Sequence, residues 1–98
     1  MLRGMTIAAN GFYGPQGRKL RLDLADPLLN QKIEAFEFEG QRITNYEMES
    51  SSLAGLAALM GHRAMTVCCI IAGRVSHNMK TDYASALDNL IDKVLERI

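Results

Sequence analysis

Hydrophobic residues in the first quarter of the chain fall into short runs, which are separated by turn-forming residues. The apolar run "GMTIAAN" over residues 4–10 is closed by an Asn-Gly pair, which predicts a buried strand ending in a turn. Residues 11–19 predict a loop. The segment "KLRLDL" over residues 19–24 alternates polar and apolar positions, which predicts either a short edge strand or an extended segment.

The middle of the chain predicts a helix followed by a strand. In "DPLLNQKIEAFEFEG", residues 26–40, Asp26 is a candidate N-cap, Pro27 suits the first helical position, and Gly40 would stop the helix. The segment "ITNYEME" over residues 43–49 begins with β-prone residues and ends with acidic ones, which predicts a strand with a polar end.

The second half predicts a helix, a strand and a helix. "SSSLAGLAALMGH", residues 50–62, has a serine as cap and Gly61 as stop. "RAMTVCCIIAG", residues 63–73, is apolar on both faces and predicts a central strand covered on both sides. "TDYASALDNLIDKVLERI", residues 81–98, is an amphipathic helix. Alternating strands and helices predict an α/β fold, and the apolar faces imply more protein than 98 residues.

Composition narrows the function classes. The 98 residues suit one small domain, and 11 basic against 11 acidic side chains argue against a dominant role on nucleic acid or at a membrane surface. We expect a cytoplasmic protein, because no apolar run could span a bilayer and the N-terminus lacks a signal-peptide pattern. The neighbours Cys68 and Cys69 would point to opposite faces of a strand, so no disulfide is expected between them. The two histidines lack further ligands at suitable spacing, so no metal is expected.

The loop "FYGPQGR" carries the first candidate chemistry. Gln16 offers a carboxamide and Arg18 a planar donor fork, two residues apart in a segment that glycines and a proline constrain. Together these groups match the edge of a flat heterocycle such as a pyrimidine base, and Phe12 could pack on its ring. A solvated turn is the alternative, which the spacing by itself favours.

The segments "YEMES" and "IIAGR" carry the other candidates, each at the predicted end of a strand. Glu47 and Glu49 could accept hydrogen bonds from the vicinal hydroxyls of a ribose, or could simply sit near a helix N-terminus and favour its dipole. Arg74, taken alone, fits an ordinary charge on a solvated rim.

Taken together, "ANGFYGPQGR", "ITNYEMESSSLAGLAALMGHRAMTVCCIIAGR" and the closing helix resemble the C-terminal part of the uridine phosphorylases, within the nucleoside phosphorylase superfamily. The resemblance implies the C-terminal portion of a three-layer αβα fold with a mixed central sheet. It implies phosphorolysis of uridine to uracil and ribose 1-phosphate, a pentosyl transfer with inorganic phosphate as co-substrate and no cofactor. It also implies a homo-oligomer, either a dimer or a hexamer of dimers.

The resemblance also implies roles for individual residues. Gln16 would read O2 and N3–H of uracil, and Arg18 would bind O4 and stabilise the departing uracilate. Glu49 would orient the ribose and favour its cationic transition state. The base-binding set is Phe12, Gln16, Arg18, Ile71, Ala72 and Arg74. The ribose-binding set is Glu47, Met48 and Glu49.

Two departures from the family pattern set further expectations. The family's chains are much longer, and their N-terminal phosphate-binding part has no counterpart here, so residues 1–98 are expected to form a single partial domain that is inactive alone. The family usually has Asn-Arg where this chain has Gly73-Arg74. An oligomerising or ligand-binding module and a purine nucleoside phosphorylase relative are the alternatives. The apolar "IIAG" favours a pyrimidine over a purine.

Overall fold

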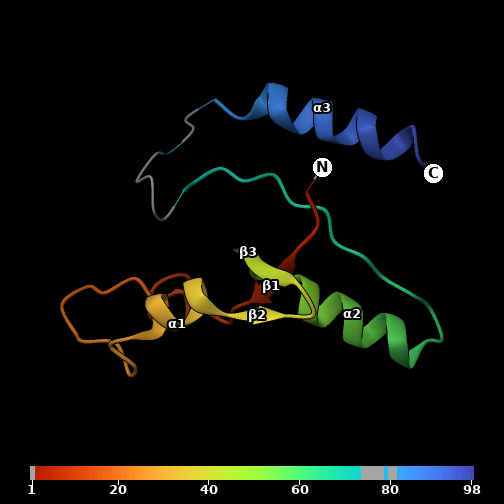
Figure 1. The fold of residues 1–98 in the computed structure, drawn as a ribbon. Coiled ribbons are helices and arrows are strands. Elements are labelled where there is room, and N and C mark those ends of the chain that lie inside the picture. Colours follow the sequence, from red (N-terminus) through yellow and green to blue (C-terminus); the bar gives the residue numbers. More distant parts are fainter. Residues whose placement is uncertain (1, 74–78, 80–81) are drawn as a thin grey trace. The chain divides into compact units, whose positions relative to one another are not determined.

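The computed structural model describes residues 2–73, 79 and 82–98. The chain divides into two compact units, Met1–Thr66 and Val67–Ile98. Figure 1 shows that the sheet and the first two α-helices belong to the first unit, whereas the second unit holds the C-terminal helix.

A three-stranded mixed sheet forms the centre of the first unit (Figure 1). β3 (Gln41–Glu47) lies in the middle, parallel to β1 (Met5–Ala8) on one side and antiparallel to β2 (Glu37–Phe38) on the other. The prediction of an α/β fold with a mixed sheet is thereby confirmed, and both strands predicted for this half are present.

The parallel pair contains an irregularity at Thr44. Met5 is paired with Ile43 but Thr6 with Asn45, so Thr44 is an extra residue in β3. Its Oγ1 donates to the Met5 carbonyl over 3.3 Å. Gly4 makes room for the bulge, because a Cβ atom there would lie 2.2 Å from the Thr44 methyl group. The pairing therefore depends on a glycine next to a β-branched side chain.

The helix predicted over residues 26–40 is shorter in the structure. α1 covers Leu29–Ala35, and Phe36 has extended backbone angles that lead into β2. Both Glu39 and Gly40 have positive φ angles, of 49° and 72°, as a tight hairpin turn between β2 and β3 requires. Pairing with β3 thus takes residues that the sequence pattern assigned to the helix. Asp26 is no helix cap; its Oδ1 instead accepts the Leu28 N–H over 3.0 Å in a turn before α1.

α2 (Ser50–Leu59) confirms the helix predicted after β3 and its stop at Gly61. Gly61 has a φ angle of 74° and donates its N–H to the Ala58 carbonyl, while His62 donates to the Ala57 carbonyl over 2.8 Å. This pair of bonds is the Schellman motif that commonly ends a helix. The predicted serine cap is wrong, because the first turn is satisfied by a carboxylate described below.

The strand predicted over residues 63–73 is wrong. This segment has no regular secondary structure, and within the described part of the chain its one β-bridge joins Ala72 to Met79. An apolar run reports a preference for burial, whereas a strand also needs a partner for its N–H and C=O groups. α3 (Ala84–Leu95) confirms the C-terminal amphipathic helix, with bounds inside the predicted range.

Many large apolar side chains stay exposed. Leu53, Leu56 and Leu59 on α2 are more than half exposed. Among the described residues, the buried ones are Ala9, directly after β1, and Gln16 and Gly17 in the turn that follows. No described helix is long and apolar enough to cross a membrane. The expectation that 98 residues leave apolar faces uncovered agrees with these exposures.

Candidate functional site

In the first unit, two polar segments leave the sheet at the same edge. Because β1 and β3 are parallel, their carboxyl ends meet there, and the loop after Ala8 starts beside the segment after Glu47. The N–H of Ala9 donates to the Glu47 carbonyl over 2.9 Å and ties the two exits together. The topology therefore brings two of the three sequence motifs to one edge.

The loop from Phe12 to Arg18 folds into a turn stabilised by its own backbone. A short 3₁₀ helix covers Gly14–Gln16, and the N–H groups of Gln16 and Arg18 both donate to the Tyr13 carbonyl, over 3.1 and 2.9 Å. Gly17 closes the turn with a φ angle of 71°, in the left-handed region that glycine adopts without strain. The glycines and the proline thus hold the polar side chains in a defined turn.

Gln16 and Arg18, the pair singled out from the sequence, are in direct contact. Arg18 Nη1 donates to Gln16 Oε1 over 2.5 Å and to the Phe12 carbonyl over 2.6 Å. The guanidinium carbon lies 3.8 Å from the centroid of the Phe12 ring, a cation–π contact. Gln16 is only 4% exposed, which is unusual for a polar side chain in a turn. A solvated turn with both side chains in water does not describe this loop.

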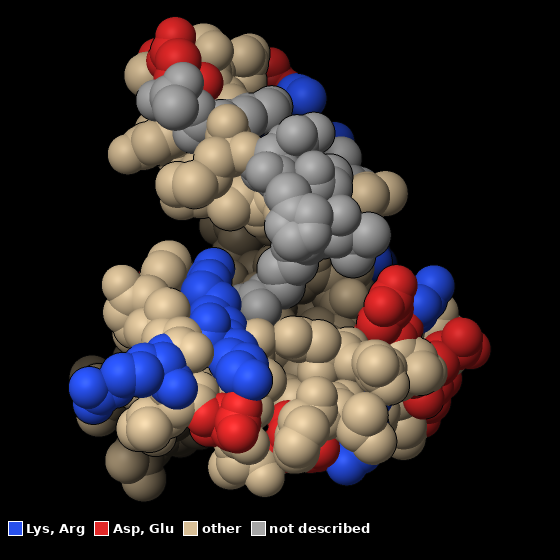
Figure 2. Space-filling model, turned by 90° about the vertical axis from the view of Figure 1, so that its left-hand side faces the viewer, with Lys and Arg blue, Asp and Glu red and all other residues tan. Residues whose placement is uncertain are grey.

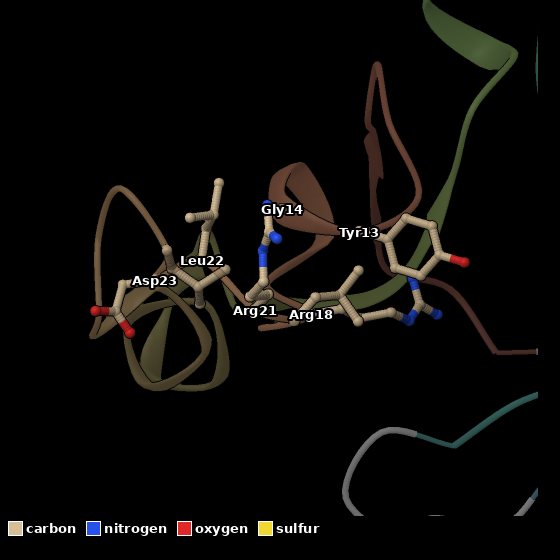
Figure 3. Close-up of a pocket in the computed structure, with 8 residues that line it drawn as sticks. Tyr13, Gly14, Arg18, Arg21, Leu22 and Asp23 are labelled. Atoms are coloured by element: carbon tan, nitrogen blue, oxygen red, sulfur yellow. The ribbon is translucent and has the colours of Figure 1, made fainter.

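A pocket of about 320 Å³ lies next to this turn. In Figure 3 the Arg21 side chain rises toward the turn at Gly14, and the Asp23 carboxylate points away from the other labelled residues. The pocket is lined by Tyr13, Gly14, Arg18, Leu20, Arg21, Leu22, Asp23 and Leu24.

Residues 19–24, which supply most of that lining, form no strand, and the chain bends at Arg21 and Leu22, so the edge strand expected as one alternative is not formed. An ion pair of 2.5 Å joins Lys19 to Asp23 within it. Sequence reasoning missed the pocket, although the alternating leucines of this segment were a signal for it.

A contact from α1 also reaches the turn. Asn30 Nδ2 donates to the Gly17 carbonyl over 2.8 Å. Sequence reasoning missed this residue, and because 13 positions separate it from Gly17, no motif could have marked it.

Glu47 organises the second motif. Its Oε2 accepts the backbone N–H of Ser50 over 2.6 Å and that of Glu49 over 2.9 Å, and its Oε1 accepts the Ser50 hydroxyl. These donors, first the Ser50 hydroxyl and then the two N–H groups, lower the pKa of Glu47. The carboxylate therefore caps α2, which is the alternative reading that the sequence left open for it.

Met48 and Glu49 are more exposed than Glu47. The Met48 side chain is 44% exposed, and Glu49 Oε2 accepts the Met48 N–H over 3.1 Å. The Glu49 carboxylate accepts this one bond where that of Glu47 accepts three, so it presents acceptor oxygens at the sheet edge.

The third motif lies in the second unit. Ile71 and Ala72 are both exposed there, and Arg74 lies outside the described residues. The structure therefore brings the first two motifs to one edge of the sheet, whereas the third belongs to the other unit.

Charge and ligand chemistry add little to this picture. Side chains of both signs share the face shown in Figure 2, which agrees with the equal numbers of acids and bases. Among residues 2–73, 79 and 82–98, no group of three or more His, Cys, Asp or Glu side chains is arranged to hold a metal ion.

The sequence was compared with known proteins. The profile of the phosphorylase superfamily matches residues 1–97. A uridine phosphorylase of Thermococcus kodakarensis is 35% identical over 80 residues, which cover 76% of this chain and 26% of that protein. The chain thus spans about a quarter of the length of the relative it matches. No solved structure gives a significant match.

Proposed function

The chain belongs to the phosphorylase superfamily, and from this membership we propose that it supplies the base- and ribose-binding residues of a uridine phosphorylase. The observation that carries the proposal is the contact between Gln16 and Arg18 in a turn at the carboxyl end of β1. A buried carboxamide and a guanidinium fork offer the mixed donors and acceptors that a uracil edge needs. The similar protein from Thermococcus kodakarensis bears the name uridine phosphorylase, which supports the same substrate class.

In the proposed complex, Gln16 pairs with O2 and N3–H of uracil and Arg18 with O4. Cleavage of the N-glycosidic bond leaves negative charge on the base, and a fixed cation at a base carbonyl stabilises that charge as it develops. The Phe12 ring packs on the base, which requires Arg18 to shift from the position above this ring that it holds here. Ile71, Ala72 and Arg74 complete the base side in this proposal.

The ribose is proposed to lie at the exit of β3. Glu49 accepts hydrogen bonds from its vicinal hydroxyls and favours the positive charge that the sugar ring acquires as the bond breaks. Met48 contacts the ring. Glu47 serves mainly by holding the start of α2 in place, because its oxygens already accept three bonds from Glu49 and Ser50.

Inorganic phosphate is the proposed attacking group, so neither a covalent nucleophile nor a cofactor is required. The complete reaction is proposed for a protein of the relative's length, acting as a homo-oligomer in the cytoplasm. The 98-residue chain is proposed to bind the nucleoside without cleaving it.

Calorimetric titration of the chain with uracil, uridine and hypoxanthine tests the proposal. We expect uracil and uridine to bind and hypoxanthine to bind at least tenfold more weakly. Arg18→Lys removes the planar fork but keeps the charge, and should weaken uracil binding by about tenfold. Arg21→Lys, at the other arginine of the pocket lining, is the matched control and should leave binding unchanged.

Three outcomes would contradict parts of this proposal. Equal effects of the two arginine substitutions on uracil binding would show that Arg18 has no specific role in the base site. Tighter binding of hypoxanthine would favour the purine branch of the superfamily. Release of uracil from uridine and phosphate by the 98-residue chain would show that the isolated chain is a complete enzyme.

A further inference from the structure

One contact in the first unit joins the candidate base-binding loop to a helix outside both motifs. Asn30 lies in the first turn of α1, and its Nδ2 donates to the Gly17 carbonyl over 2.8 Å. Gly17 is buried and stands between the two side chains proposed to read the base. The contact is therefore placed where it can fix the direction in which both side chains leave the turn.

The close fit of Asn30 against Gly17 shows how tightly this contact is built. A Cβ atom at position 17 would lie 2.1 Å from Asn30 Oδ1 and 2.9 Å from its Cγ, so the amide group occupies the space that any larger residue would need. The left-handed φ angle of Gly17 adds a second reason for glycine. Both the sequence of the turn and the position of α1 are thus fitted to one another.

The position of Asn30 itself is held from the start of α1. Asp26 Oδ1 accepts the Leu28 N–H over 3.0 Å, and its Oδ2 pairs with Lys32 over 2.6 Å. These contacts bracket Asn30 on both sides along the helix. A chain of local contacts therefore runs from Asp26 through α1 to the Gly17 carbonyl.

We propose that Asn30 is a positioning residue for base recognition, which clamps the Gly17 carbonyl and so presents the Gln16 carboxamide and the Arg18 guanidinium to a pyrimidine edge. The inference rests on the proposed function for its ligand. The clamp itself is a property of the free chain, which makes the two separable by experiment.

Asn30→Ala is the direct test, because it removes the donor and leaves the helix intact. We expect uracil affinity to fall about fivefold, the ratio that corresponds to one net hydrogen bond. Affinity for ribose 1-phosphate, which the proposed function places at the exit of β3, should stay unchanged. Asn30→Asp, which keeps the shape but cannot donate, should behave like the alanine variant.

Asn89→Ala is the matched control. Asn89 also donates its Nδ2 to a backbone carbonyl over 2.8 Å, that of Ser85, but it does so within α3 in the second unit. Its loss should change neither ligand's affinity.

Amide hydrogen exchange in the ligand-free chain reads the clamp without any ligand. The N–H groups of Gln16, Gly17 and Arg18 are all hydrogen-bonded within the turn, and they should exchange faster in Asn30→Ala and at the original rate in Asn89→Ala. Exchange in α2 should not change.

The outcomes separate the two proposals. Unchanged uracil affinity in Asn30→Ala, or an equal loss for uracil and ribose 1-phosphate, overturns the positioning role, since the second result reports general destabilisation. Failure of the unaltered chain to bind uracil overturns the proposed function. In that case amide exchange in Asn30→Ala still tests whether Asn30 clamps the turn. Unchanged exchange rates at the three turn amides overturn the clamp, and faster rates confined to these amides support it.

Discussion

The two polar exits of the sheet are built in different ways. The Phe12–Arg18 loop combines its own backbone turn with a side-chain contact from Asn30, 13 positions beyond Gly17. The segment after β3 is satisfied locally, because the Glu47 carboxylate accepts its three bonds from residues two and three positions away. The first exit is therefore sensitive to changes elsewhere in the unit, whereas the second carries its order within five residues.

The largest effect expected from this difference is that of Gly17→Ala. The new methyl group would meet Asn30 Oδ1 and would also force a left-handed backbone, which alone costs about 1–2 kcal/mol. We expect the free energy of unfolding in urea to fall by more than this amount, and uracil binding to be lost.

Gly40→Ala is the control for that comparison. Gly40 has nearly the same φ angle, 72°, but no atom lies within 4 Å of a Cβ there, so it should show the backbone cost alone. Equal losses for the two variants would show that Asn30 yields to the added methyl group, and that the loop depends less on α1 than the structure indicates.

An intermediate effect is expected from pH at the second exit. Because the pKa of Glu47 is lowered in the folded chain, its contribution to stability is complete above the ordinary glutamate pKa of about 4.3 and is lost as the pH falls through the lower folded value. Protonation removes acceptors from the first turn of α2. Carbon-13 Cα shifts of α2 should therefore move toward unfolded values over that acidic range.

Glu47→Gln should already show the weakened helix start at neutral pH and should remove most of this pH dependence. Glu49→Gln, two residues further along the chain, should leave the pH transition unchanged. If the transition instead survived in Glu47→Gln and vanished in Glu49→Gln, the cap would belong to Glu49, and its assignment to Glu47 would be wrong.

The smallest effect is expected from Ser50→Ala. The substitution removes the hydroxyl that donates to Glu47, and should therefore lower the free energy of unfolding. It should also raise the pKa of Glu47 toward its ordinary value, since this hydroxyl is the main cause of the shift. Ser51→Ala, at an exposed position of the same turn, should change stability by less than about 0.5 kcal/mol. Equal losses of unfolding free energy in the two serine variants would show that the Ser50 hydroxyl does not contribute to the cap.

Local patterns accounted for most of what the sequence predicted correctly. Gln16 and Arg18 meet because a turn rich in glycine and proline leaves few conformations for residues two apart. Gly61 ends α2 because its left-handed conformation is a local property. Both strands of the parallel pair, β1 and β3, were also evident from their apolar and β-branched residues.

Features that depend on pairing between distant segments were not predicted. Glu37 and Phe38 join a hairpin because β3 is available to pair with, and nothing within residues 26–40 encodes that competition. The apolar residues 63–73 form no strand for the converse reason. Asn30 acquires its role through a backbone carbonyl, which leaves no trace in the identity of the residue that accepts.

The extra residue at Thr44 determines which way the acidic motif faces. Side chains alternate between the two faces of a strand, so each residue added or removed before Glu47 turns every later side chain over. Without Thr44, the positions of Asn45, Tyr46 and Glu47 would be exchanged between the faces of β3 relative to β1. A single threonine, accommodated by Gly4, thus determines on which face of the sheet the carboxylates at its edge lie.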